Sequence, residues 1–268
     1  MRPRITIITP NFNHAEWLER AMKSVLDQGY PNLEYMVLDG GSTDGSAELI
    51  ERYSDRISLW RSGPDGGQVA AINRGIEESS GEIIGYLNSD DYYLPGAFDR
   101  AVDAFESSNK LWAVGASVFT GDRTAEVGFS IDRWTPRLPV GPRSHWVLYQ
   151  WGFPQPSCFW RRELFDQVGC FDDDLRYVFD TEHGLRCLLM GEEPAIIQAD
   201  LAARFLHADT KSAADDAGWN KERKLMQAKL KRLLSPRERA WYLGEKALER
   251  SGVYGLFNAK ESLAKPAP

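Results

Sequence analysis

Two patterns of apolar positions alternate along the first 120 residues of the chain. Short continuous runs of β-branched and aromatic residues predict buried strands, and stretches with apolar residues every three or four positions predict amphipathic helices. The predicted strands cover residues 5–9, 34–38, 57–60, 82–87 and 112–119. Helices are expected from a capping box at Asn13 and Glu16, through Leu49, near Gln68 and from Pro95. This alternation predicts right-handed βαβ units, and hence an α/β fold with a mainly parallel central sheet and helices on both faces.

Polar side chains stand at the ends of three of these predicted strands. They are Thr9, Asp39 and the adjacent pair Asp90 and Asp91. In an open α/β sheet the ligand site lies outside the carboxyl ends of the strands, so these residues predict a site at that edge. Asp39 can accept hydrogen bonds from a nucleobase or a ribose hydroxyl. The acidic pair fits a helix cap as well as a hard divalent cation shared with a diphosphate.

The composition narrows the class of protein. The chain has 268 residues, of which 43% are hydrophobic and 26% charged, as expected for a globular protein with one large domain. Its net charge of -7 disfavours nonspecific binding to nucleic acid. No apolar stretch approaches the ~20 residues that span a bilayer, and the N-terminus does not resemble a signal peptide. Three widely spaced cysteines favour reduced thiols, so we expect a cytoplasmic protein.

Charge and periodicity both change near Ser212. Residues 1–211 carry 20 Lys/Arg and 32 Asp/Glu, whereas residues 212–268 carry 12 and 7. We therefore expect a main domain over residues 1–212 and a helical extension over residues 213–268. Two interpretations of the basic amphipathic helix in this extension remain open. Its leucines either pack onto the main domain or lie on an anionic membrane.

Several motifs together resemble those of the family-2 inverting glycosyltransferases of the GT-A type. They are ITIITPNFN, VLDGGSTDGS, GPDGGQVAAINRG, LNSDDYYLPGA, the stretch from Gln155 to Gly169, and Asp180-Thr181-Glu182 with Leu185-Arg186. The resemblance covers roughly residues 4–212. It implies a Rossmann-like GT-A fold with a nucleotide-sugar-binding half over about residues 1–118 and an acceptor and catalytic half over residues 119–212.

The resemblance also implies a nucleoside-diphosphate-sugar donor, of UDP or dTDP type with UDP preferred, and a Mn²⁺ or Mg²⁺ ion. The residues it places along the donor are Thr9, Pro10, Asn11, Asp39, Gln68, Asn73, Asp90 and Lys211. Asp91 is the expected main ligand of the cation, and Asp90 and His207 are expected to share it. The chain departs from the family pattern at Asn88, which is often Asp, and at Ile72, which is often Arg.

For the chemistry, the resemblance implies that Asp180 is the base that deprotonates the acceptor hydroxyl. Glu182 and Arg186 stand at the spacing expected from this Asp, although Phe179 replaces a common Glu. Glu182 is expected to orient the acceptor, and Trp151 and Gln155 to line its side of the site. The expected acceptor is a carbohydrate or a lipid-linked sugar in polysaccharide or glycolipid synthesis.

Other functions of an α/β fold fit less well. A noncatalytic sugar-nucleotide-binding or scaffold protein is the main alternative, and Asp180 argues against it. A dinucleotide-dependent oxidoreductase is disfavoured because no G-x-G-x-x-G follows the first strand. A sugar nucleotidyltransferase is disfavoured because no Gly-rich, Arg-containing loop follows Thr9.

Overall fold

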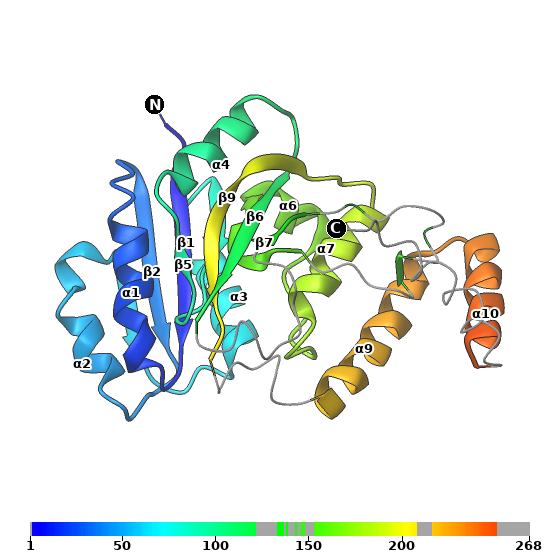
Figure 1. Ribbon diagram of the computed structural model, residues 1–268, viewed down its shortest axis with the longest axis horizontal. Helices are drawn as coiled ribbons and strands as arrows, with labels where there is room; N and C mark the ends of the chain where they lie inside the picture. The colour runs from blue at the N-terminus through cyan, green and yellow to red at the C-terminus, as the bar shows by residue number, and fades with distance from the viewer. Residues whose placement is uncertain are drawn as a thin grey trace, which may run out of the picture.

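In the part of the chain that the structure describes, the fold is built around one curved sheet of nine strands (Figure 1). The computed structural model describes residues 2–121, 133–136, 138, 143, 146–147, 153–207 and 216–250. The strands are β1 Ile5–Asn11, β2 Leu33–Asp39, β3 Leu59–Ser62, β4 Ile83–Tyr86, β5 Tyr92–Tyr93, β6 Trp112–Thr120, β7 Arg133–Trp134, β8 Cys158–Arg161 and β9 Ala195–Phe205. Their order in the sheet is β3-β2-β1-β4-β8-β6-β9-β5, and β7 pairs with β6.

The half of the sheet made from the first 90 residues is parallel, as predicted. Strands β3, β2, β1 and β4 pair in parallel, so their carboxyl ends meet at one edge. Strands β6 and β9 run in the same direction, whereas β8, β5 and β7 run against their neighbours. The pattern of apolar positions does not indicate these antiparallel strands, since a run of two to four residues is too short to show a period.

The helices cover both faces of the sheet, because successive strand residues point to opposite faces. Ile5 and Ile7 pack in a core with the helices α1 Ala15–Leu26, α2 Ser46–Glu51 and α4 Ala97–Glu106. Ile8 packs in a second core on the other face. The helices that line this core are α3 Gln68–Glu78, α6 Arg162–Val168, α7 Phe179–Leu189, α9 Asp216–Leu230 and α10 Pro236–Arg250. Short 3₁₀ turns cover Ser54–Arg56, Gln155–Ser157 and Lys231–Leu233.

Helix α3 lies so close to β1 that only glycine fits at one of its positions. A Cβ atom added to Gly75 would lie 2.8 Å from two side-chain atoms of Ile8 and 2.9 Å from a third. Ile8 is fully buried, so a larger residue at position 75 would force a shift within the packed core. This close approach fixes α3, and with it Gln68 at the start of the helix, against the carboxyl end of the sheet.

The start of α1 differs from the predicted capping box. The helix begins at Ala15, no side chain of its own caps it, and Asn13 has a left-handed backbone with φ 55°. Instead, the Asp44 carboxylate accepts a 2.8 Å hydrogen bond from Ala15 N, and the Asn13 side-chain oxygen accepts one from Thr43 N. The capping-box prediction is therefore wrong: the loop after β2 caps α1, which joins the two loops at the site edge.

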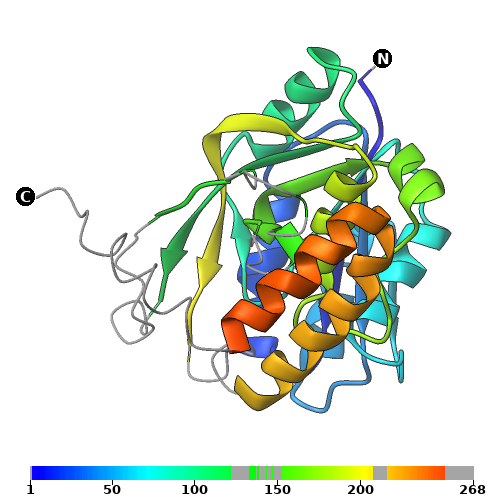
Figure 2. The ribbon, with the colours of Figure 1, turned by 90° about the vertical axis from the view of Figure 1, so that its right-hand side faces the viewer.

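The two C-terminal helices share the core of the main domain. Met226, Leu230, Leu234 and Tyr242 are buried in the same cluster as residues of α3, α6 and α7. Helix α10 lies alongside α9 as an outer layer (Figure 2). Residues 208–215 lie outside the described ranges, so the boundary at residue 212 stays a prediction. Among the helices of the described ranges, none combines the length and the apolar character needed to cross a membrane.

Candidate active site

Three polar side chains are buried where β1, β2 and β4 end. Asn11, Asp39 and Asp91 expose 4%, 2% and 3% of their surface, although nothing in an ordinary core requires polar groups there. Pro10 pairs with Leu38 one step before the edge. The side chain of Thr9 is fully buried, and its hydroxyl lies 3.0 Å from the Tyr35 hydroxyl. This contact favours a structural role for Thr9 over the predicted contact with the nucleotide-sugar donor.

Asp39 organises the loop that follows β2. One carboxylate oxygen accepts hydrogen bonds from the Asn11 amide, at 2.7 Å, and from the Ser42 hydroxyl. The other accepts them from the backbone N–H groups of Gly41 and Ser42 and from the Ser62 hydroxyl. Burial alone would raise the pKa of Asp39, but the hydrogen bonds from Ser42, Ser62 and Asn11 outweigh it and hold the pKa below its ordinary value. An ionised carboxylate is therefore built into this edge.

An exposed aromatic residue, Phe12, stands next to this loop. It exposes 60% of its surface, and its ring lies 3.2 Å from the position that a Cβ atom on Gly40 would occupy. A flat apolar ring beside buried polar groups is suited to stacking with a base. Phe12 was not among the predicted site residues, although an aromatic residue directly after a strand end is the signal that indicates it.

Asn88 joins three of the predicted site residues in one hydrogen-bond network. Its side-chain oxygen accepts a 2.7 Å hydrogen bond from Gln68. Its amide donates to Gln155 at 3.3 Å and, more weakly, to Asp91 at 3.5 Å. Gln155 in turn donates to the Tyr86 carbonyl at 3.0 Å. Residues from α3, the β4 end and the turn before β8 therefore meet at one place, and Asn88 is the hub that the sequence analysis did not include among the site residues.

The predicted cation ligands lie together beside this network. His207 Nε2 is 3.2 Å from an Asp90 carboxylate oxygen, and its ring stacks on Trp17 with centroids 3.8 Å apart. Asp91 accepts a 3.1 Å hydrogen bond from Phe205 N. Burial and the neighbouring charge of Asp90 raise the pKa of Asp91 to about 8. The fold therefore holds two adjacent carboxyl groups that a cation would stabilise in the ionised form.

These ligands do not form a complete protein cage. Within the described part of the chain, no three acidic, histidine or cysteine side chains converge on a point where they would hold a metal ion. Mg²⁺ and similar hard cations are usually held by one or two carboxylates together with waters and substrate phosphates. The acidic pair fits that arrangement, in which a substrate supplies the remaining oxygen ligands.

Asp180 lies in the first turn of α7, and its carboxylate accepts a 2.6 Å hydrogen bond from Thr181 N. The phenol of Tyr86, at the end of β4, is buried and has no hydrogen-bond partner among the residues that the structure describes. Burial, followed by the charge of Asp180, raises the pKa of Tyr86 well above its ordinary value, and Asp91 adds to the effect. The charges of Asp180 and Asp91 therefore both act on the same tyrosine at the carboxyl end of β4.

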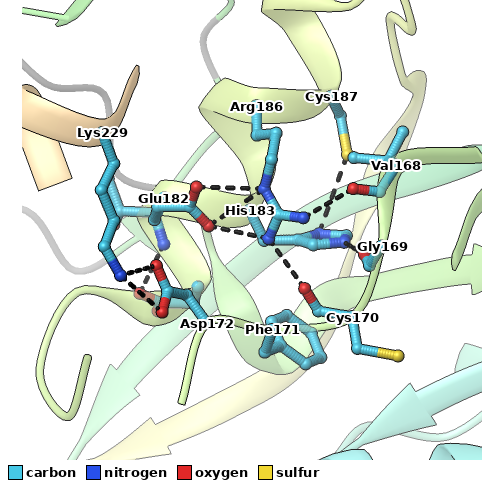
Figure 3. A network of polar contacts seen from close by, with 12 residues as sticks. Val168, Gly169, Cys170, Phe171, Asp172, Glu182, His183, Arg186, Cys187 and Lys229 are labelled. Atoms are coloured by element: carbon cyan, nitrogen blue, oxygen red, sulfur yellow. Dashed lines mark hydrogen bonds and ion pairs between the residues drawn. The ribbon is translucent and has the colours of Figure 1, made fainter. Parts of the chain in front are cut away.

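Glu182 is held in a buried ion pair (Figure 3). Both of its carboxylate oxygens accept hydrogen bonds from Arg186, at 2.8–3.2 Å, and only 3% of the residue is exposed. Arg186 also donates to the carbonyls of Val168 and Cys170. His183 beside them is buried near the Gly169 carbonyl, and desolvation lowers its pKa to about 3. These contacts favour a structural role for Glu182 over the predicted contact with the acceptor.

Asn73 likewise uses its whole amide inside the protein. Its nitrogen donates to the Phe171 carbonyl at 2.9 Å and to Asp173 at 2.7 Å, and its oxygen accepts from Phe171 N at 3.1 Å. These bonds favour a role in joining α3 to the segment before α7 over the predicted donor contact. The other two predicted residues, Trp151 and Lys211, lie outside the described residues.

The family model described as Glycosyl transferase family 2 matches residues 6–169. The chain belongs to this family. It is 30% identical to the uncharacterized glycosyltransferase Rv1514c of Mycobacterium tuberculosis over 72% of each chain. TuaG of Bacillus subtilis, a glycosyltransferase provisionally assigned to teichuronic acid biosynthesis, is 28% identical over 46% of this chain and 50% of its own. The protein is therefore a glycosyltransferase, and this family membership excludes the alternative of a dinucleotide-dependent oxidoreductase.

Two solved structures of glycosyltransferases share the fold. S. aureus TarS 1–349 in complex with UDP-GlcNAc has a TM-score of 0.60 and 15% identity over 79% of this chain, and the chain spans 61% of that structure. The mannosyltransferase PcManGT from Pyrobaculum calidifontis, in complex with GDP-Man and Mn²⁺, has a TM-score of 0.59 and 20% identity over 98% of this chain and 81% of its own. These similarities confirm the predicted GT-A fold with C-terminal helices.

Proposed function

We propose that this glycosyltransferase moves a sugar from a nucleoside-diphosphate donor to an acceptor hydroxyl with inversion, and that the reaction depends on a divalent cation. One observation carries the proposal. The buried carboxyl group of Asp91, after β4, and the separate carboxylate of Asp180, at the start of α7, both act electrostatically on Tyr86. In this proposal the donor side and the base therefore use distinct carboxylates.

The donor would lie along the ends of β1 and β2. Phe12 offers a stacking surface, and Asn11 with the Asp39 loop offers polar groups beside it. Gln68 and Asn88 would face the sugar-diphosphate side. A UDP-type donor is preferred in our proposal, supported by the UDP-GlcNAc complex of TarS, while the GDP-Man complex of PcManGT makes a guanine donor the first alternative to test.

Asp91 and Asp90 would hold the cation, and His207, whose Nε2 lies 3.2 Å from an Asp90 carboxylate oxygen, would support Asp90. When bound, the cation would neutralise charge on the departing diphosphate. Mn²⁺ is a candidate because the similar PcManGT structure contains it, and Mg²⁺ takes the same oxygen ligands.

Asp180 would accept the proton of the acceptor hydroxyl as that oxygen attacks the anomeric carbon. The bond from this carbon to the diphosphate oxygen breaks on the opposite face, so the configuration inverts. A positioned general base contributes roughly 10²–10⁴ to the rate. Gln155, fixed between Asn88 and Tyr86, would line the acceptor side. The acceptor is proposed to be a growing polysaccharide or glycolipid, in line with the assignment of TuaG.

The test of this function is an NMR assay of the product. Purified protein is incubated with Mn²⁺, α-linked UDP- or GDP-sugars and a panel of sugar acceptors. We expect release of the nucleoside diphosphate together with a β-linked product from one donor. An α-linked product would contradict inversion, and full transfer in the presence of a chelator would contradict the dependence on a cation.

We also propose that α10 contacts the cytoplasmic face of a membrane. Trp241 and Leu243 flank the buried Tyr242 on two sides of the helix and expose 61% and 63% of their surface, and Arg237, one turn before Trp241, is exposed as well. Trp and Arg together suit an anionic lipid surface, and residues 212–268 carry a net charge of +5.

Cosedimentation with vesicles that contain an anionic phospholipid should fall in the double variant Trp241→Ser and Leu243→Ser. Unchanged binding, or a dimer of the wild-type protein that the substitutions dissociate, would contradict this.

A further inference from the structure

Helix α9 contacts the segment that leads into the proposed base. This segment runs from residue 168, at the end of α6, to residue 178, and α7 follows with Asp180 as its second residue. Apart from the short turn closed by Leu175 N on the Asp172 carbonyl, its conformation depends on contacts with the helices around it. In the described structure, the side chains that hydrogen-bond to the segment lie on α3, α7 and α9, and Phe171, Leu175 and Val178 of the segment are buried in the core.

Glu222 of α9 binds the segment three residues before the base. One of its carboxylate oxygens accepts hydrogen bonds from two successive backbone N–H groups, those of Arg176 at 2.8 Å and Tyr177 at 2.6 Å. A carboxylate that accepts from backbone amides makes stronger bonds than a neutral acceptor. Two bonds to adjacent peptide groups fix the direction of the chain as it enters α7.

Lys229, about two turns further along α9, binds the middle of the segment. Its ammonium group donates to both oxygens of Asp172, at 2.9 and 2.6 Å (Figure 3). It also donates to Asp174 at 2.7 Å. The side chains of Lys229 and Asp172 are 27% and 20% exposed, so solvent screens this ion pair only in part. The two α9 residues thus bind the segment at two places, Asp172 with Asp174 and the backbone of Arg176 and Tyr177.

The opposite side of the segment is held by α3 and α7. Asn73 pairs with both the N–H and the carbonyl of Phe171, and Arg186 binds the carbonyls of Val168 and Cys170. With those contacts in place, residues 168–171 are fixed without α9. Residues 172–178, which connect them to the base, are held by Glu222 and Lys229 together with the Asn73–Asp173 hydrogen bond and the buried side chains of Leu175 and Val178.

We infer that α9 is a positioning element of the active site and that Glu222 and Lys229 set the place of Asp180. The inference rests on the proposed role of Asp180 as base. Neither residue reaches the substrate in this account: they act through the backbone of residues 172–178. Helix α9 would then be part of the catalytic unit, although the match to the family model ends at residue 169.

The test compares turnover and donor binding in variants of α9. Glu222→Ala should lower kcat by roughly 10- to 100-fold, since a misplacement of about 1 Å can cost that much, and leave the KM for the donor within about twofold. Glu222→Gln keeps an acceptor oxygen for the two N–H groups and should restore most of kcat. Lys224→Ala, an exposed change on the same helix, is the matched control and should leave kcat unchanged.

Hydrogen exchange supplies a readout that does not depend on activity. In Glu222→Ala the amides of Arg176 and Tyr177 should exchange faster than in the wild type, while those of β1 and β2 should not change. If Glu222→Ala does not fold, Lys229→Ala carries the same test, with the faster exchange at residues 172–175. Wild-type kcat in a folded Glu222→Ala, or equal losses in Glu222→Ala and Glu222→Gln, would overturn the inference. A wild-type protein without transferase activity would instead overturn the proposed function.

Discussion

Asp180→Asn should lower the rate of sugar transfer by roughly 10²–10⁴-fold, the usual contribution of a general base. The amide has nearly the shape of the carboxylate, but it cannot accept the proton of the acceptor hydroxyl. Donor binding should stay within about twofold of the wild type, because the proposed donor-binding groups come from the ends of β1, β2 and β4 and from the start of α3. The measurements are kcat under saturating donor and the dissociation constant of the nucleoside diphosphate.

Asp166→Asn is the matched control, since it makes the same chemical change at an exposed position of the neighbouring helix α6. It should leave kcat and donor binding unchanged. Transfer by Asp180→Asn at the wild-type rate would remove the proposed mechanism. A loss of nucleotide binding in the same variant would place Asp180 on the donor side and would contradict the division of roles between the carboxylates.

Asp91→Asn should abolish cation-dependent transfer, with a loss of roughly 10²-fold or more, because charge neutralisation at a leaving group supplies several kcal/mol. The same substitution should stabilise the metal-free protein at neutral and mildly alkaline pH. The introduced amide stays neutral in its buried position beside Asp90, whereas the carboxyl group of Asp91 must either ionise there or take up a proton. A carboxyl group that is unfavourable in the free protein but is needed to bind a cation should show this combination of lost activity and increased stability when it is replaced.

The pH dependence of this gain follows from the raised pKa. The folded state favours the protonated Asp91, whose pKa is raised from 3.8 to about 8 by burial and by the charge of Asp90. Its contribution to stability is complete below the unfolded pKa and is lost as the pH rises through the folded value. Between about pH 4 and pH 8, the wild type should therefore lose stability steadily relative to Asp91→Asn as the pH rises.

Thermal unfolding in a chelator, at intervals from pH 5 to pH 9, measures this difference. The gap between Asp91→Asn and the wild type should widen with pH and level off above about pH 8. Added Mn²⁺ should narrow the gap, since a bound cation stabilises the ionised carboxylate. A gap that does not vary with pH would show that Asp91 does not take up a proton on folding.

The parallel half of the fold could be predicted from the sequence because its signals are local. Each apolar run from β1 to β4 is bounded by turn residues, and strand ends such as Asp39 and Asp91 meet at one edge in any parallel sheet. The antiparallel strands could not be predicted, because β8 and β5 have four and two residues and their partners are distant in the sequence.

The site was harder to predict because a residue type does not specify its partner. Asn73 and Glu182 have the chemistry of ligand-binding residues, but the fold brings Phe171 to the first and Arg186 to the second. The predicted Asn13 cap was wrong because Asp44, from a different loop, reaches Ala15 N. Asn88 departs from the family pattern, and only the three-dimensional contacts with Gln68 and Gln155 reveal it as the hub of the network.

The affinity for a nucleoside diphosphate, measured by calorimetry with and without Mn²⁺, tests the separation of cation site and base most directly. UDP and GDP are titrated into the wild type, Asp91→Asn and Asp180→Asn. Mn²⁺ should tighten binding of one nucleotide by about tenfold or more, worth about 1.4 kcal/mol, in the wild type and in Asp180→Asn, and have little effect in Asp91→Asn. Equal tightening in Asp91→Asn, or its loss in Asp180→Asn, would contradict the account.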